Sequence, residues 1–152
     1  MTEIRLTTVI NAPIEKCFDL SRDVDVHMLS TKQTGERVVA GRTAGLCELH
    51  DEITWEARHF GIRQKLQVKI TTMDRPHSFS DQMLKGAFKS MFHTHRFEEK
   101  NGTTFMHDDF RYEVPFWFIG WIFDRFVLKK YMTRFLEERN RVIKGLAEGK
   151  AN

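Results

Sequence analysis

Cysteine and proline are scarce in this sequence. Among 152 residues there are only 2 Cys and 3 Pro. Cys17 and Cys47 match neither the ligand spacing of a zinc site nor a disulfide framework, which excludes a disulfide-stapled scaffold. Free thiols are typical of a reducing compartment. Residues 1–6 are polar and alternating rather than an apolar leader, and we therefore expect a cytoplasmic protein.

Long hydrophobic runs and a strong charge of either sign are also missing. The longest apolar run is residues 114–123 (VPFWFIGWIF), far shorter than the roughly 18 to 20 residues that span a bilayer. The net charge is +3 and both signs are mixed along the chain, so we expect no nucleic-acid partner. Neither repeats nor a linker interrupt the sequence. We predict that residues 1–152 form a single domain.

Aromatic residues, in contrast, are frequent. The chain has 13 Phe, 3 Trp and 2 Tyr, and Phe alone outnumbers the 9 Gly. Large flat side chains suit a thick core or a wide apolar pocket. A chain of this length can bury such a core without staples.

The first third of the chain predicts a strand, two short helices and a second strand. Residues 4–10 alternate as a half-buried strand does. Pro13 suits a first helical turn, and the apolar spacing that follows predicts a short helix over residues 14–20. A second helical piece is expected over residues 23–29, and a strand over residues 36–40.

Two tight turns set the register of the strands that follow. Gly61-Ile62 predicts a type II′ turn and Asn101-Gly102 a type I′ turn. The expected pairs are Ile53 with Ile70, Trp55 with Val68, Ala57 with Leu66 and His59 with Gln64 in the first hairpin, and Phe97 with Met106, His95 with Asp108, His93 with Phe110 and Met91 with Tyr112 in the second.

A long helix over about residues 120–149 is predicted to close the chain. The apolar stripe of this helix must pack against a sheet, and the apolar face of the sheet must be covered by a helix. We therefore predict an α+β helix-grip fold, a curved antiparallel seven-stranded sheet wrapped around the C-terminal helix, with two short helices after strand 1. The stripe comprises Trp121, Leu128, Met132, Phe135, Arg139, Val142 and Leu146.

Several local strings resemble the START-like superfamily, also called SRPBCC or polyketide cyclase/dehydrase-like. The resemblance covers nearly the whole chain and points to a bacterial subfamily of small, stand-alone ligand-binding proteins. It implies the helix-grip fold of the pollen allergens, in a superfamily that includes lipid carriers, hormone receptors, cyclases and chaperone-activating proteins. The strings are residues 10–18 (INAPIEKCF), 55–61 (WEARHFG), 79–83 (FSDQM), 93–97 (HTHRF) and 112–115 (YEVP).

Two histidines spaced i and i+2 on one strand, His93 and His95, point the same way. This is how sheet-based zinc sites begin, with Asp108 as a third ligand or a partner of an imidazole. The other interpretation is a pair of cavity-wall histidines bonded to carboxylates. Because only one ligand pair is secure, we expect no metal and no cofactor.

The same group could also transfer protons. As an alternative function, His95 and Asp108 would be the catalytic pair of a cyclase- or dehydratase-type enzyme. Arg139, on the apolar stripe, would pair with Asp81 or Asp108, clamp a ligand carboxylate, or extend from the stripe edge to water.

Residues 116–123 (FWFIGWIF) could dock on a membrane, with Arg125, Lys129 and Lys130 meeting lipid heads. We favour instead a buried or lid-forming start of the long helix, and keep a membrane-surface or partner-binding module as a further alternative. The main prediction is a cavity for a small hydrophobic or amphipathic molecule of the lipid, polyketide or aromatic acid type. The expected ligand-binding residues are Trp55, His59, Asp81, Met83, His93, His95, Asp108, Tyr112 and Arg139.

Overall fold

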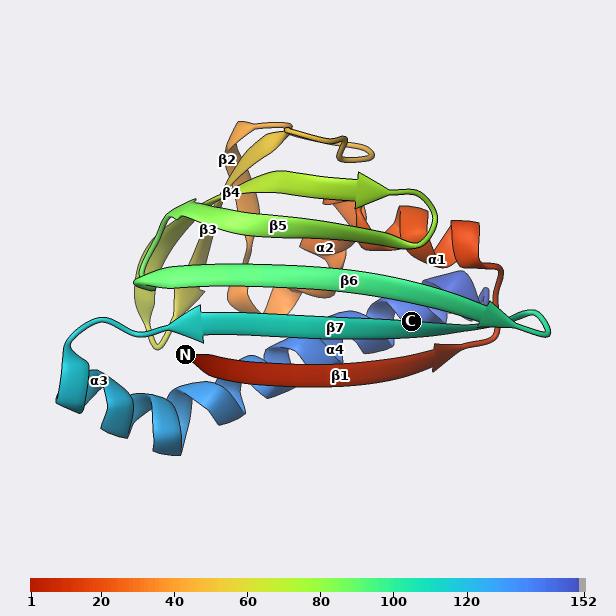
Figure 1. Cartoon of the computed structure of the whole chain (residues 1–152). Helices are drawn as coiled ribbons and strands as arrows, with labels where there is room; N and C mark the ends of the chain where they lie inside the picture. Colours follow the sequence, from red (N-terminus) through yellow and green to blue (C-terminus); the bar gives the residue numbers. More distant parts are fainter. Residues whose placement is uncertain (151–152) are drawn as a thin grey trace.

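The computed structural model describes residues 1–150, in which the strands and helices follow one another in the predicted order (Figure 1). Two short helices follow the first strand, and six further strands precede the long helical segment. The elements are β1 (Thr2–Ile10), α1 (Ile14–Ser21), α2 (Val24–Ser30), a 3₁₀ turn (Lys32–Thr34), β2 (Arg37–Gly41), β3 (Glu52–His59), β4 (Ile62–Asp74), β5 (Ser78–Lys85), β6 (Ser90–Lys100), β7 (Thr103–Glu113), α3 (Trp117–Phe123), a π-helical segment (Asp124–Leu128) and α4 (Lys129–Ala147).

The seven strands form one antiparallel sheet in the order β1-β7-β6-β5-β4-β3-β2. The sheet curves around α4, which contacts β1, α1 and α2 (Figure 1). The predicted α+β helix-grip fold is confirmed. Among residues 1–150, no helix combines the length and the apolarity needed to cross a membrane.

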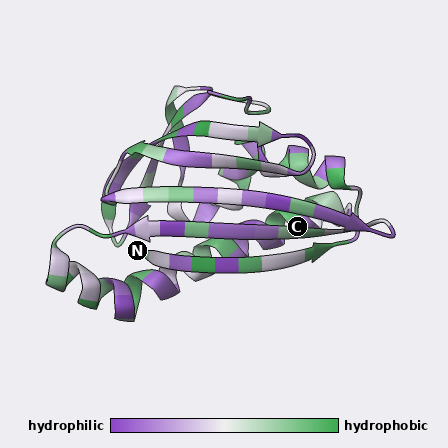
Figure 2. Ribbon diagram, in the orientation of Figure 1, coloured by the Kyte–Doolittle hydropathy of each residue, from purple (hydrophilic) through white to green (hydrophobic). Residues whose placement is uncertain are grey.

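The β6–β7 hairpin has the predicted register. Asn101 and Gly102 adopt φ values of 53° and 77°, as a type I′ turn requires. His95 lies opposite Asp108, and all four expected pairs are formed. The side chains alternate along these strands, and Figure 2 shows the same alternation of hydropathy along β1.

The predicted register of the β3–β4 hairpin is wrong by two residues. Trp55 pairs with Leu66 instead of Val68, because the turn lies at Phe60-Gly61 rather than at Gly61-Ile62. Phe60 has a φ of 52°, and its ring packs 4.5 Å from that of Tyr131. This contact compensates for an unfavourable backbone conformation. A two-residue shift leaves each side chain on its predicted face.

The C-terminal helical segment starts earlier than predicted and contains one π-helical turn between α3 and α4. That turn changes the helical phase, so Trp121 lies off the buried stripe and is 56% exposed. Leu128, Met132 and Val142 are buried as expected. Gly120 is required here, because a Cβ atom would lie 2.0 Å from the carbonyl oxygen of Pro115.

Candidate functional site

A cavity of about 370 Å³ lies between the inner face of the sheet and the helices. This volume falls within the range of small-molecule sites. The walls are mainly apolar side chains from β3, β4, β6, β7 and α4, among them Trp55, Val68, Met91, Phe110 and Leu136. The cavity is therefore suited to an apolar molecule.

One end of the cavity is open to solvent and aromatic. Phe60, Phe116 and Phe123 line it, and all three side chains are exposed. Arg139 also lines the cavity and follows Phe123 by 16 residues in the helical segment. At the rise of an α-helix, this separation along the axis is roughly 24 Å. A ligand that enters between these phenylalanines thus has a deep apolar channel before it.

A polar cluster, which we call the His/Asp cluster, lies at the inner part of the cavity: Asp81, His93 and His95 border the cavity, and Asp108 lies behind them. His93 Nε2 and His95 Nδ1 each lie 2.9 Å from Asp108 Oδ1. His95 Nε2 lies 3.6 Å from Asp81 Oδ2. Asp81 comes from β5, the histidines from β6 and Asp108 from β7, so adjacent strands bring the four together.

Asp108 is the buried centre of this cluster. Burial alone would raise the pKa of its carboxyl, yet the contacts with His93 and His95 hold that pKa well below its ordinary value. Asn140 donates a hydrogen bond of 2.6 Å to Oδ2. Asp108 does not line the cavity itself, so it acts on a ligand only through the histidines.

Asp81 and His93 face the cavity and carry shifted pKa values. Burial would raise the pKa of Asp81, but His95, His93 and Arg139 lower it below the ordinary value. Burial lowers the pKa of His93, with a contribution from His95. At neutral pH the carboxyl is therefore charged and the His93 imidazole neutral.

Arg139 is buried, with 3% of its surface exposed, and the idea that it extends to water is wrong. Its Nη2 donates to the carbonyl of Ser21 at 3.0 Å, and its Nη1 donates to Asn140 Oδ1 at 3.1 Å. Nη1 also lies 3.9 Å from Asp108 Oδ1. The guanidinium thus pairs with Asp108, one of the expected partners, and still borders the cavity.

Trp55 and His59 line the cavity as well. The Trp55 ring lies 4.2 Å from the ring of His27. His59 Nδ1 forms a 2.7 Å hydrogen bond with the hydroxyl of Tyr131, and burial lowers the pKa of His59. Of the expected residues, these two and four others border the cavity: Asp81, His93, His95 and Arg139.

Met83 and Tyr112 do not border the cavity, contrary to what we expected of them. Met83 packs against the core from the rim of β5, beside Gly86. Tyr112 is fully buried, and its hydroxyl donates to Asp124 in the π-helical segment. It therefore positions α3 rather than contacting a ligand.

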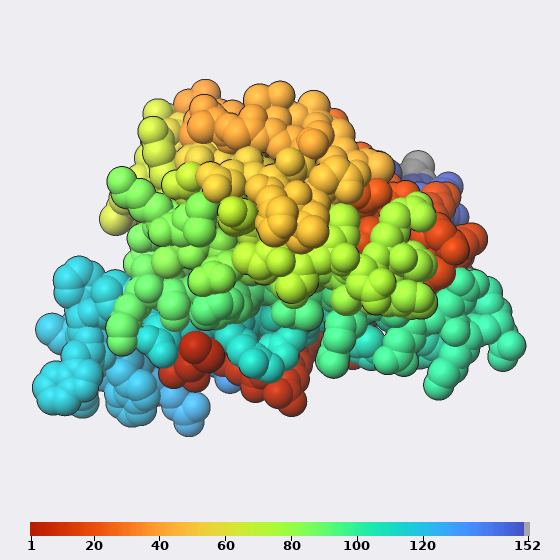
Figure 3. All heavy atoms as spheres, turned by 45° about the horizontal axis from the view of Figure 1, so that its top comes forward, coloured from red at the N-terminus to blue at the C-terminus, as the bar shows by residue number. Residues whose placement is uncertain are grey.

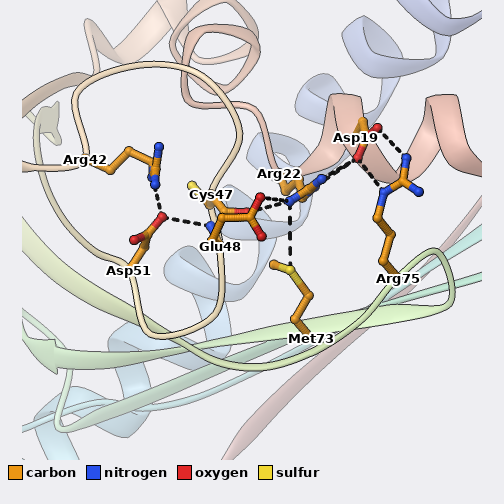
Figure 4. Close-up of polar contacts among 8 residues, drawn as sticks. All are labelled: Asp19, Arg22, Arg42, Cys47, Glu48, Asp51, Met73 and Arg75. Atoms are coloured by element: carbon orange, nitrogen blue, oxygen red, sulfur yellow. Dashed lines mark hydrogen bonds and ion pairs between the residues drawn. The ribbon is translucent and has the colours of Figure 1, made fainter.

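Sequence reasoning missed Arg22, which borders the cavity from the end of α1. Its guanidinium donates to the carbonyl of Cys47 and to Glu48, each at 2.9 Å, and pairs with Asp19 (Figure 4). Nearby, Asp51 accepts hydrogen bonds from Arg42 and from the Glu48 amide. These contacts hold the β2–β3 connection over the cavity. The sequence signal for them was an arginine between two predicted short helices.

We favoured a buried or lid-forming helix start for residues 116–123, and the buried form is wrong; the lid-forming one stays a prediction, since Phe116 and Phe123 border the cavity. Seven of these eight residues are exposed, five of them by more than half, and Trp117 reaches 92%. The segment protrudes at one end of the molecule in Figures 1 and 3. A hydrogen bond from Tyr112 to Asp124 holds its base, and Phe60 packs against Phe123, while the side chains of residues 116–119 stay exposed.

Solved structures share this fold. Protein TTHA0849 from Thermus thermophilus is similar over 96% of this chain and 99% of its own, with 18% identity and a TM-score of 0.74. A START superfamily protein from Mycobacterium smegmatis gives 14% identity and 0.72 over 97% of both chains. Major latex-like protein 151 from Panax ginseng gives 14% and 0.68 over 96% of this chain and 97% of its own.

These likenesses confirm the helix-grip fold that the sequence predicted. No protein-family model and no curated protein matches the sequence. The fold is therefore shared with proteins of distant sequence, and the function has to be argued from the site itself.

Proposed function

We propose that this protein binds one small hydrophobic or amphipathic molecule in the cavity beneath α4. The observation that carries the proposal is an apolar cavity with an aromatic opening and a buried polar cluster within it. Soluble proteins fill such spaces with side chains unless a ligand takes their place. Each CH₂ group of a ligand buried there contributes about 0.8 kcal/mol.

The polar residues suggest how the ligand is oriented. Its apolar body would pack against Trp55, Phe110 and Leu136, and its polar end would meet Arg139 and His95. The positively charged guanidinium of Arg139 can donate hydrogen bonds to a carboxylate or to a hydroxyl group. A fatty acid, a polyketide or an aromatic acid has this shape and polarity, and a cytoplasmic location would suit the two free, buried thiols.

Native mass spectrometry of the purified protein tests this proposal. We expect a mass above that of the chain, which denaturation removes, and extraction should recover a molecule with an apolar body and one polar end. A matched preparation of Ala57→Phe, which places a ring in the cavity, should lack it. Equal amounts of the molecule in both preparations would contradict the proposal.

We also propose that α3 contacts an anionic lipid surface. Exposed Phe and Trp side chains cover α3, and the sole acidic residue between Val114 and Leu136 is the buried Asp124. Exposed cations follow directly, at Arg125, Lys129, Lys130 and Arg134. Aromatic side chains next to cations favour the interface of an anionic membrane. The cavity opens beside this helix, so a ligand could pass between lipid and protein.

An enzyme remains the alternative in which the His/Asp cluster transfers a proton. In that case His95 would meet the substrate, and Asp108 would orient His95 from behind. The test is turnover of an extracted ligand by wild type and by His95→Gln, with unchanged melting as the control for folding. Turnover that survives in His95→Gln would exclude this role.

A further inference from the structure

The His/Asp cluster contains three side chains whose ligand atoms converge. Asp81, His93 and His95 each offer one such atom, and all three atoms lie within 4.8 Å of one another. The separation between Asp81 Oδ2 and His95 Nε2 is 3.6 Å. Two ligands of a tetrahedral zinc ion are about 3.4 Å apart when each metal–ligand bond is about 2.1 Å long. Small side-chain movements would therefore bring all three to an ion.

Asp108 has the position of the supporting carboxylate in such a site. Its Oδ1 lies 2.9 Å from one ring nitrogen of each histidine. His93 Nε2 forms a hydrogen bond with this oxygen, and an N–H group donated there leaves Nδ1 of the same ring with a lone pair for a metal. Asn140 donates to the second oxygen of Asp108, which fixes the carboxylate in turn. His93 is thus oriented by a buried group that is not itself a ligand, while His95 Nδ1 lies close to the same group without forming a hydrogen bond.

The charges of the cluster leave room for a cation. The cluster contains two carboxyl groups, those of Asp81 and Asp108, and the guanidinium of Arg139 lies close by as a partner of Asp108. This guanidinium is held by Ser21 and Asn140 and lies 3.9 Å from Asp108. Among residues 1–150 no arginine or lysine forms an ion pair with Asp81, whose carboxylate instead faces His95. His95 Nε2 faces the Asp81 carboxylate across 3.6 Å, a separation longer than a hydrogen bond.

We propose that Asp81, His93 and His95 bind one divalent cation of the zinc class at the wall of the cavity. Two imidazoles and one carboxylate are a ligand set that zinc accepts, and three protein ligands leave a coordination position open. Because all three residues border the cavity, that position faces the space assigned to the small molecule. The ion would add a second positive group beside Arg139 for the polar end of a ligand. The site itself does not depend on that ligand.

Titration with zinc alone tests the proposal. Protein freed of metal by a chelator is titrated with ZnCl₂ by calorimetry, and with CoCl₂ by visible absorption. We compare wild type with Asp81→Asn, His93→Gln and Asp108→Asn. Matched controls are Asp109→Asn and His107→Gln, which lie on the opposite face of β7. Circular dichroism without metal shows which variants fold.

We expect one ion per chain in wild type and in both controls, with the intense cobalt bands of a tetrahedral site. Affinity should fall at least tenfold in Asp81→Asn and in His93→Gln, and the bands should disappear. In Asp108→Asn, loss of the supporting carboxylate should weaken binding by about tenfold to a hundredfold. Absence of saturable binding in wild type, or equal zinc affinity in folded Asp81→Asn, would overturn the proposal. Neither result would bear on the binding of a small molecule.

Discussion

The hydroxyl of Tyr112 donates a hydrogen bond to the buried carboxylate of Asp124, which joins β7 to the π-helical segment. Thr2 donates to the other oxygen of the same carboxylate. Asp124 is thereby held at the base of the protruding α3 helix by two strands of the sheet. The position of the exposed aromatic side chains, and of the cavity opening beside them, depends on this contact.

Replacing Tyr112 by Phe should therefore destabilise the protein. A buried carboxylate that loses a donor costs about 1 to 3 kcal/mol in the free energy of unfolding. Because Thr2 still donates to Asp124, we expect a loss of stability in the lower half of that range. Urea denaturation measures it. Unchanged stability in Tyr112→Phe would mean that Asp124 finds another donor and that Tyr112 does not fix α3.

Acidification should weaken the fold partly through His59. Burial lowers the pKa of His59 in the folded protein, against the opposing charge of Glu36. The unfolded chain then binds a proton at higher pH than the folded chain does. Stability is therefore retained above the ordinary histidine pKa of about 6.5 and falls as the pH drops below it. His93, whose pKa is lowered too, acts in the same direction.

The variant His59→Gln isolates this contribution. Between pH 7.5 and pH 5, its free energy of unfolding should fall less than that of wild type. The difference should be part of the roughly 1.4 kcal/mol per pH unit that one proton can contribute. His77→Gln, at an exposed histidine, is the control. Equal pH dependence in His59→Gln and wild type would refute a buried, neutral His59.

Cys47 should react slowly with alkylating reagents in the folded protein. Burial raises the pKa of its thiol to about 12, with a contribution from Asp51. At pH 8 the thiolate is then about a thousandfold rarer than in an unfolded chain. Mass spectrometry after iodoacetamide treatment, with and without urea, measures the ratio. If Cys47 of the folded protein were labelled as fast as in urea, the part of the cavity wall that contains Cys47 would have to open readily.

Liposome flotation tests the lipid contact of α3. We expect binding to vesicles that contain phosphatidylglycerol, and a loss of about tenfold or more in the double variant Trp117→Ser/Trp121→Ser. Added salt should weaken binding of wild type, because part of the attraction is electrostatic. Ile62→Ser, which removes an exposed apolar side chain from β4, is the matched control and should bind as wild type does.

A second copy of the chain is the competing occupant of this surface. Sedimentation distinguishes the two. A wild-type dimer that Trp117→Ser/Trp121→Ser converts to a monomer, without flotation of wild type, would contradict the lipid proposal and identify α3 as an interface between copies.

Local signals in the sequence predicted much of the sheet. Asn101-Gly102 determined the β6–β7 register, since both residues tolerate the positive φ values of a type I′ turn. At the β3–β4 turn the same reasoning gave the wrong register. Phe60 occupies a turn position whose backbone conformation a phenylalanine disfavours. Its packing against Tyr131, which lies 71 residues later in the sequence, compensates for this cost.

The candidate site was predictable where strand alternation decides. The inward faces of His93, His95 and Asp81 followed from the period of two along each strand. Helical positions were harder, since the π-helical segment rotates α3 relative to α4 and carries Trp121 to the surface. The role of Tyr112 was likewise hidden, because its partner Asp124 lies beyond the end of the sheet.

Titration with 1-anilinonaphthalene-8-sulfonate, an apolar body with one anionic group, tests the central claim most directly. We predict saturable binding of one molecule per chain, weakened at least about tenfold in Ala57→Phe, which fills the cavity, and nearly unchanged in Ala40→Phe, at an exposed position on β2. Both variants should melt cooperatively. Equal affinity in wild type and folded Ala57→Phe would show that the molecule binds elsewhere and would contradict a ligand cavity beneath α4.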